Sequence, residues 1–221
     1  MKIAAIIPAR KGSKRIKNKN RLLIEGKPMI GLVAEILEQA QIFEQVFLST
    51  DDAVLKKEYQ DTLTVLSRPK ALADDHSTAI DMLRYHQANE LKHFDLICLI
   101  FAHAVNINYK DIVEAISKFK KSPSNRLMSI CKLPVPLEWT YKINKESLDP
   151  HFPNAELIRS QDLGSCYFDA GQFYLFKSTW FEKCELHPIA WHELKPLQSV
   201  DLDEPEDLEI MKLFYRMNNA I

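Results

Sequence analysis

The side chains best suited to chemistry near the start of the chain are cations. Residues 10–21 read RKGSKRIKNKNR and hold seven lysines and arginines, with no acid before Glu25. Gly12 lets the backbone come close to a ligand, and Ser13 adds a hydroxyl. Backbone N–H groups in such a turn can surround phosphate oxygens. The segment therefore predicts a polyphosphate site, although a solvated basic loop or a nucleic-acid patch would have the same composition.

Two common phosphate-binding motifs, GxGxxG and GxxxxGK[ST], do not occur in the sequence, so the predicted site is of a different type. The formal net charge of the whole chain is -1. A nucleic-acid binder is typically basic over a whole face and has aromatic residues among its cations, so the sequence disfavours that function.

A pair of carboxylates near the end of the chain is the second feature that suggests chemistry. Asp201 and Asp203 are separated by one residue, and on an extended segment such residues point the same way. Two carboxylates could then share one Mg²⁺, which prefers oxygen ligands and substrate phosphates. The alternative is a cap for the last helix, with Asp203 as N-cap, and both roles could coexist.

Covalent catalysis and a zinc site are not indicated. The sequence has no convincing Ser-His-Asp or Cys-His arrangement, and structural or hydrogen-bonding roles are favoured for His76, His86 and His103. The four cysteines stand far apart without a CxxC pair, which disfavours zinc and is typical of a reducing compartment.

The hydrophobic pattern indicates elements that would hold these residues in place. Residues 2–7 form an apolar run before Pro8, as expected for a strand covered on both faces. Strands alternate with helices from there, which predicts a three-layer α/β fold with a mostly parallel sheet. The basic loop then lies at the carboxyl edge of the sheet, where open α/β sheets bind ligands. Further strands are predicted at 45–49, 62–66, 95–101, 127–131 and 172–176, and helices at 29–40, 77–91, 109–121 and 204–217.

Residues 132–165 contain four prolines and little helical periodicity. We interpret them as an extended insertion in a single domain that covers residues 1–221, with apolar side chains available for an interface. No apolar run approaches the roughly 20 residues needed to cross a bilayer, so no membrane association is expected. The apolar run at the N-terminus is too short for a signal peptide, and we expect the protein in the cytoplasm.

Several of these segments together resemble a known family. The run IIPARKGSKRIKNKN resembles the opening of the CMP–acidic-sugar synthetases, the cytidylyltransferases that activate sialic-type sugars, whose outline is IPAR-x-GSK-x-x-x-x-KN. The segments RSQDL at 159–163 and DAGQFY at 169–174 resemble the branch acting on pseudaminic acid. Other matches follow in order along the chain: GKPMI at 26–30, STDD at 49–52, Arg68-Pro69, LADD at 72–75 and DLDEPED at 201–207.

The resemblance implies a nucleotide-diphospho-sugar transferase-like fold and a homodimer formed through residues 132–165. It implies a reaction between CTP and a nine-carbon acidic sugar, preferably pseudaminic acid, that releases pyrophosphate with Mg²⁺ or Mn²⁺ as cofactor. The anomeric hydroxyl of the sugar would attack the α-phosphorus in line, so that the protein mainly positions the reactants and stabilises charge.

The resemblance also implies roles for individual residues. Arg10, Lys14 and Lys19 would be catalytic, by neutralising phosphate oxygens. The nucleotide would be bound by Ala9, Arg10, Gly12, Ser13, Asn20 and Arg68. Arg159 would pair with the sugar carboxylate, and Gln161, Asp169 and Gln172 would hydrogen-bond its hydroxyl or acetamido groups. Asp201 and Asp203 would bind the metal, and Asp51 and Asp52 would organise the loop.

Three positions depart from the pseudaminate pattern. His103 stands in place of a small hydroxyl residue, Val105 in place of proline, and Phe168 in place of histidine. Two other functions therefore stay open: a synthetase for N-acetylneuraminic or legionaminic acid, and a non-catalytic relative that binds a nucleotide or sugar.

Overall fold

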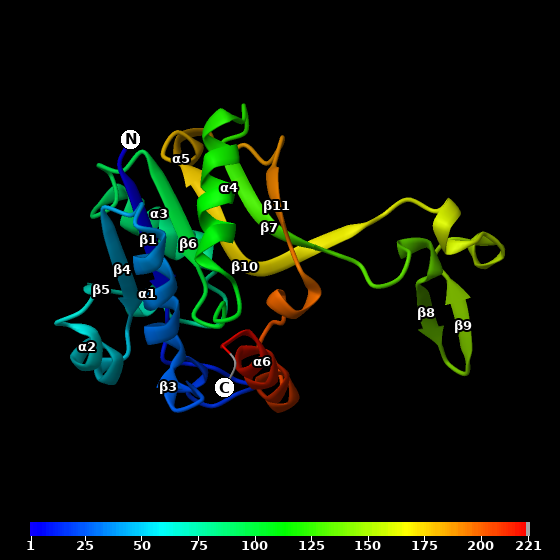
Figure 1. Ribbon diagram of the computed structural model, residues 1–221, viewed down its shortest axis with the longest axis horizontal. Helices are drawn as coiled ribbons and strands as arrows, with labels where there is room; N and C mark the ends of the chain where they lie inside the picture. Colours follow the sequence, from blue (N-terminus) through cyan, green and yellow to red (C-terminus); the bar gives the residue numbers. More distant parts are fainter. Residues whose placement is uncertain (220–221) are drawn as a thin grey trace.

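A seven-stranded sheet in the order β11-β7-β10-β6-β1-β4-β5 forms the centre of the computed structural model, which describes residues 1–219 (Figure 1). Every neighbouring pair is parallel except those that contain β10, which runs antiparallel to both β6 and β7. The predicted α/β fold with a mostly parallel sheet is confirmed. The strands are β1 (Ile3–Pro8), β4 (Gln45–Thr50), β5 (Thr64–Ser67), β6 (Leu96–Ile100), β7 (Arg126–Lys132), β10 (Tyr167–Lys177) and β11 (Ala190–Leu194).

Helices cover both faces of this sheet, which gives the three predicted layers (Figure 1). Residues of α1, α4 and α6 belong to the hydrophobic core on one face, and residues of α3 and α5 belong to the core on the other. The helices are α1 (Met29–Ala40), α2 (Ala53–Tyr59), α3 (Ala79–Ala88), α4 (Tyr109–Lys121), α5 (Trp180–Lys183) and α6 (Pro205–Asn219).

Shorter elements connect these main ones. Two hairpins are formed by β2 (Leu23–Ile24) with β3 (Lys27–Pro28), and by β8 (Tyr141–Asn144) with β9 (Ser147–Pro150). Single turns of 3₁₀ helix are η1 (Lys19–Arg21), η2 (Lys70–Leu72), η3 (Leu137–Trp139), η4 (Ala155–Leu157), η5 (Ser160–Asp162) and η6 (Pro196–Gln198).

Strand β1 shows why the apolar run near the start of the chain does not alternate between apolar and polar residues. All six of its residues are buried. Ile3, Ala5 and Ile7 pack into the core beneath α1 and α4, whereas Ala4 and Ile6 pack into the core beneath α3. Because successive side chains of a strand point to opposite faces, a central strand between two helical layers must be apolar at every position.

The ends of β1 and β4 are joined just beyond the sheet. The Ala9 amide donates to Ser49 O (2.9 Å), and the Thr50 hydroxyl donates back to Ala9 O (2.5 Å). Since Ala9 and Thr50 are both buried, these bonds fix the point at which the basic loop leaves the sheet.

An arm made of residues 133–166 projects from the body between β7 and β10 (Figure 1). At its base the Leu133 amide donates to Cys166 O (2.9 Å). Because β10 runs against its neighbours, β7 ends and β10 begins at the carboxyl edge of the sheet, so the arm leaves the body from the edge that carries the basic loop. The predicted insertion, residues 132–165, differs from this arm by one residue at each end.

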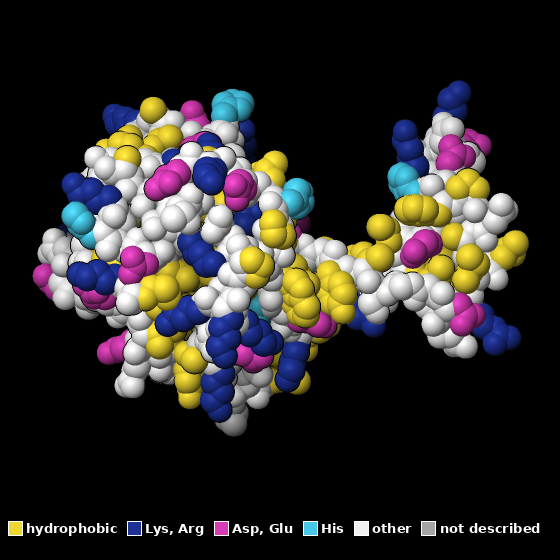
Figure 2. Space-filling view, turned by 90° about the horizontal axis from the view of Figure 1, so that it is seen from above, with side chains coloured by type: hydrophobic (Ala, Val, Ile, Leu, Met, Phe, Trp, Pro, Cys, Tyr) yellow, Lys and Arg dark blue, Asp and Glu magenta, His cyan; other side chains and the backbone are white. Residues whose placement is uncertain are grey.

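The arm carries many apolar side chains on its surface (Figure 2). Those with large exposed areas include Val135, Leu137, Ile143, Leu148 and Leu157.

One expectation about the last helix is wrong. Helix α6 begins at Pro205, so Asp203 lies outside it and is not its N-cap. The Asp207 carboxylate instead accepts from the amides of Asp203 and Glu204, at 2.9 and 2.7 Å. The Asp203 carboxylate is therefore available for other contacts. Within residues 1–219, no helix is both long enough and apolar enough to span a membrane.

Candidate active site

A cavity of about 540 Å³ lies at the carboxyl edge of the sheet, where the loops after β1, β5 and β6 meet the bulge in β10 and residues 201–203. Five cationic side chains and three carboxylates line it. The cations are Arg10, Lys14, Arg15, Lys19 and Arg68, and the carboxylates are Asp75, Asp201 and Asp203. Gly12, Ser13 and Asn20 also line this cavity, which we call the main pocket.

Two acids that follow β4, Asp51 and the buried Asp52, hold the basic loop in place. Asp52, whose side chain is 3% exposed, receives two hydrogen bonds from Arg21, at 2.8 and 2.5 Å. Burial alone would raise the pKa of Asp52, but the bonds from Arg21 and the Val54 amide outweigh burial and hold that pKa below its usual value. Asp51 accepts from the Lys11 amide (2.8 Å). The expectation that Asp51 and Asp52 organise this loop is confirmed.

The loop is also closed by a contact within itself. The Asn20 side-chain amide donates to Arg10 O (2.9 Å), so the two ends of the segment lie together. The Asn20 side-chain amide therefore helps to hold the shape of the loop. Asn20 also lines the main pocket.

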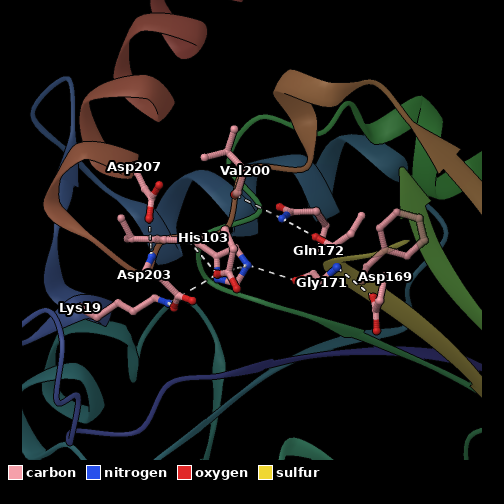
Figure 3. Close-up of polar contacts among 12 residues, drawn as sticks. Lys19, His103, Asp169, Gly171, Gln172, Val200, Asp203 and Asp207 are labelled. Atoms are coloured by element: carbon pink, nitrogen blue, oxygen red, sulfur yellow. Dashed lines mark hydrogen bonds and ion pairs between the residues drawn. The ribbon is translucent and has the colours of Figure 1, made fainter. Parts of the chain in front are cut away.

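Asp201 and Asp203 converge on one cation. The Lys19 ammonium lies 3.6 Å from Asp201 Oδ1 and 3.7 Å from Asp203 Oδ1, and Arg15 Nη2 lies 2.6 Å from Asp203 Oδ1. Figure 3 shows Lys19 and Asp203 directed toward the same point as His103. The prediction that residues i and i+2 of this segment point the same way is confirmed.

His103 closes this side of the main pocket. Its Nε2 lies 3.1 Å from Gly171 O and 3.4 Å from Asp201 Oδ1, and its ring stacks on Phe101. A carbonyl oxygen can only accept, so Nε2 carries the proton. Burial lowers the pKa of His103 and outweighs the opposite effect of Asp201, which favours the neutral ring.

The bulge in β10 brings the Gly171 carbonyl to His103. The pairing of β10 with β7 shifts register between Asp169 and Tyr174, and Gly171 has φ = 63°, a conformation that favours glycine. The Asp169 carboxylate accepts from the Gly171 amide (2.9 Å) and the Tyr174 hydroxyl (2.8 Å). The glycine of the DAGQFY segment is therefore explained by backbone geometry.

Some residues expected at the site lie elsewhere. The expectation that Gln172 binds substrate needs correction, because its side chain is 1% exposed and its amide donates to Ala170 O (3.0 Å) and Val200 O (3.3 Å). The latter bond ties β10 to the segment that carries Asp201. Ala9 is buried beneath the loop. Arg159 and Gln161 lie on the arm and do not line the main pocket.

Asp169 lies at a second, smaller cavity of about 270 Å³. Ala79, Phe101 and Tyr174 line both cavities, so the two adjoin. The smaller cavity is otherwise lined mainly by apolar side chains, among them Ile80, Leu99 and Met128.

Several lining residues were not predicted from the sequence. Arg15 lies in the basic loop but at a position where the family outline is free, and Asp75 is the last residue of the LADD match. Tyr174 is the last residue of the DAGQFY match. All three residues lie in segments that match the family outline. Residue type alone, however, does not predict which side chains of those segments face the main pocket.

A divalent cation such as Mg²⁺ needs several oxygen ligands around one point. Residues 1–219 contain no group of three or more histidine, cysteine or acidic side chains placed to hold a metal. The pair Asp201 and Asp203 nevertheless fits Mg²⁺ or Mn²⁺, because both carboxylates reach a common cation, Lys19, and magnesium commonly takes its remaining ligands from phosphates and water.

Comparisons with known proteins show the family and the fold. A family model described as "Cytidylyltransferase" matches residues 4–219. Pseudaminic acid cytidylyltransferase from Campylobacter jejuni (strain 81-176) is 31% identical, over 99% of this chain and 98% of that protein. The Helicobacter pylori protein named pseudaminic acid cytidylyltransferase and UDP-2,4-diacetamido-2,4,6-trideoxy-beta-L-altropyranose hydrolase is also 31% identical; the match covers 91% of this chain but only 40% of that protein. A solved structure of CMP:2-keto-3-deoxy-manno-octonic acid synthetase complexed with CTP superposes with a TM-score of 0.74 at 18% identity, over all of both chains.

A specific contact between Arg10 and a phosphate group can be distinguished from a general attraction by the positive charge of the loop. Arg10 lines the main pocket, whereas Lys17 belongs to the same loop but is exposed outside it. Arg10→Ala should weaken CTP binding roughly 10- to 100-fold, the value of one lost charge-assisted hydrogen bond. Lys17→Ala should change it less than about threefold, as expected for a screened surface charge. Calorimetric titration with CTP measures both, and equal losses would contradict the assignment of Arg10.

Proposed function

The chain belongs to the cytidylyltransferase family, and we propose that within it the chain couples CTP to pseudaminic acid, yielding the CMP-sugar and pyrophosphate. It is thus a nucleotidyltransferase that uses CTP and an acidic sugar. The observation that carries the proposal is the convergence of Arg10, Lys14 and Lys19 with Asp201 and Asp203 on the main pocket. This arrangement suits a substrate that is itself a polyanion and gains charge as it reacts.

In the proposed reaction, the anomeric oxygen of the sugar attacks the α-phosphorus of CTP. A new P–O bond forms, the bond from the α-phosphorus to the bridging oxygen breaks, pyrophosphate leaves, and the hydroxyl proton is released. Arg10, Lys14 and Lys19 neutralise phosphate oxygens, while Gly12 and Ser13 allow the loop backbone to approach them. Asn20 and Arg68 are assigned to the cytidine side of the nucleotide.

Asp201 and Asp203 are proposed to hold Mg²⁺ or Mn²⁺. When bound, such an ion offsets charge on the phosphates and on the departing pyrophosphate. The protein contributes the orientation of the carboxylates: the Leu202 amide donates to Asp201 Oδ1 (2.7 Å), and His103 lies against the same oxygen. Burial would raise the pKa of Asp201, but Lys19 and the Leu202 amide outweigh burial and hold that pKa below its usual value, so Asp201 stays ionised at neutral pH.

We place the sugar beside Tyr174 and Asp169, where the smaller cavity adjoins the main pocket. The Asp169 carboxylate only accepts hydrogen bonds, so it suits a sugar that offers N–H or O–H donors. The apolar lining of the smaller cavity suits the methyl groups of acetamido substituents. These features favour a di-acetamido sugar such as pseudaminic acid.

We propose that the chain forms a homodimer through the arm. Arg159 and Gln161 are assigned to the sugar but lie on the arm, outside the pocket of their own chain. The arm also exposes apolar side chains such as Ile143 (76%) and Leu157 (81%), which a second copy would cover. We propose that each arm docks on the partner and brings Arg159 and Gln161 to the partner's main pocket.

The substrate proposal predicts a ranking of sugars and nucleotides. Pyrophosphate release with CTP should have a higher kcat/KM for pseudaminic acid than for legionaminic acid, N-acetylneuraminic acid or the eight-carbon acid Kdo, because the segments RSQDL at 159–163 and DAGQFY at 169–174 resemble the pseudaminate branch. CTP should be preferred over ATP, GTP and UTP. A clear preference for another of the four sugars would overturn the assignment of pseudaminic acid and leave the family intact.

The metal proposal predicts that Asp201→Asn and Asp203→Asn each lower kcat by orders of magnitude without changing the melting temperature. A lost metal contact removes stabilisation of the transition state, and neither side chain caps α6. Asp111→Asn is the matched control: it should lower the melting temperature and preserve kcat, because Asp111 accepts from the Asn108 amide at the start of α4 (2.9 Å) and does not line the main pocket. Turnover that survives EDTA would rule out the metal.

The dimer proposal predicts complementation between two inactive variants. Arg159→Ala and Asp203→Asn should each be nearly inactive, the first because its arm lacks the arginine and the second because its pocket lacks the acid. Co-refolded in equal amounts, they should recover about a quarter of the wild-type sites, since in a two-fold dimer half of the molecules are mixed and one of their two sites is complete. No recovery in confirmed mixed dimers would show that each arm serves its own chain.

A further inference from the structure

Asp75 lies in the main pocket between two cations assigned to the triphosphate. Its Oδ1 lies 3.1 Å from Arg10 Nη1, and its Oδ2 lies 2.7 Å from Lys14 Nζ. The carboxylate therefore bridges the two sides of the Gly12–Ser13 turn. One anion thus already uses donors that a phosphate group would need.

The contacts of Asp75 differ from those of its neighbour Asp74. Asp74 accepts from the backbone amides of His76 and Ser77, at 3.0 and 2.7 Å, and so shapes its own loop. Among residues 1–219, the carboxylate of Asp75 has hydrogen bonds or ion pairs only with Arg10 and Lys14. Folding of the 68–79 loop therefore does not explain an acid at position 75.

We propose that Asp75 is an internal competitor of the substrate phosphates: its carboxylate and the triphosphate share Arg10 and Lys14, so each weakens the hold of the other. The inference rests on the proposed function, since it assigns these two cations to CTP. Two anions that share donors repel each other, and binding of the triphosphate displaces Asp75. The side chains of Asp75 and Lys14 are 39% and 76% exposed, so this ion pair is screened by water and is readily exchanged.

The same competition acts on the product. After transfer of the cytidylyl group, pyrophosphate is left among the cations that bound the triphosphate. Asp75 can re-form its bonds to Arg10 and Lys14 and thereby lowers the affinity of the loop for pyrophosphate. The hydrogen bond from Lys14 holds the pKa of Asp75 below its usual range, so the competitor keeps its charge throughout the neutral pH range.

The test compares Asp75→Asn with the wild-type chain for binding of CTP, CDP, CMP and cytidine by calorimetry, and for inhibition by pyrophosphate. The variant should bind CTP about two- to tenfold more tightly, the range expected when one or two exposed ion pairs no longer compete. The gain should shrink from CTP to CMP and vanish for cytidine, and pyrophosphate should inhibit at lower concentration. Glu44→Gln is the control, because it removes the same charge from an exposed ion pair with Lys2 (3.1 Å) elsewhere.

Three results would overturn the inference. Unchanged or weaker CTP binding by Asp75→Asn would show that Asp75 positions Arg10 and Lys14 for the nucleotide rather than competing with it. An equal gain in Glu44→Gln would indicate a general effect of net charge. A wild-type chain that binds CTP no better than cytidine would overturn both this inference and the assignment of the basic loop. Asp75→Ser provides the same comparison if the asparagine variant does not fold.

Discussion

The structure of the site depends on one contact between opposite ends of the sequence, the Lys19 ammonium between Asp201 and Asp203. Five cations around one cavity repel one another, and the carboxylates among them offset that repulsion. In return, Lys19 helps to hold the pKa of Asp201 below its usual value despite partial burial. Each group therefore stabilises the charge of the other. We propose that phosphate and metal replace these partners when the substrates bind.

The fold explains why these groups meet. Parallel strands β1, β4, β5 and β6 all end at one edge of the sheet, so the loops that follow them share one surface. The reversed strand β10 contributes its beginning to that edge instead of its end, together with the bulge at Gly171. The arm leaves from the same edge. A single topological irregularity therefore places the bulge of β10 and the arm at the edge of the sheet that carries the basic loop.

Much of this arrangement could be predicted from local pattern. The helix predicted at 29–40 is α1 and the helix predicted at 109–121 is α4, because apolar spacing marks each of them and Asn108 caps the second. Strand β11 was missed, since Ala190–Leu194 is a short edge strand with exposed Trp191 and Glu193. Contacts between distant segments could not be predicted from the sequence. The residues around Gln172 do not reveal that its side chain turns inward to Val200, and those around Arg159 do not reveal that the arm holds it away from the pocket of its own chain.

A crystal structure with a non-hydrolysable CTP analogue and Mg²⁺ or Mn²⁺ would test whether the main pocket works by exchange of ion-pair partners. In that complex, Lys19 Nζ should leave Asp201 and Asp203 for a phosphate oxygen. Both carboxylates should then bind the metal, with oxygen–metal distances of about 2.0–2.1 Å for Mg²⁺. A complex in which Lys19 still lies between the two carboxylates, with the metal bound elsewhere or not at all, would contradict it.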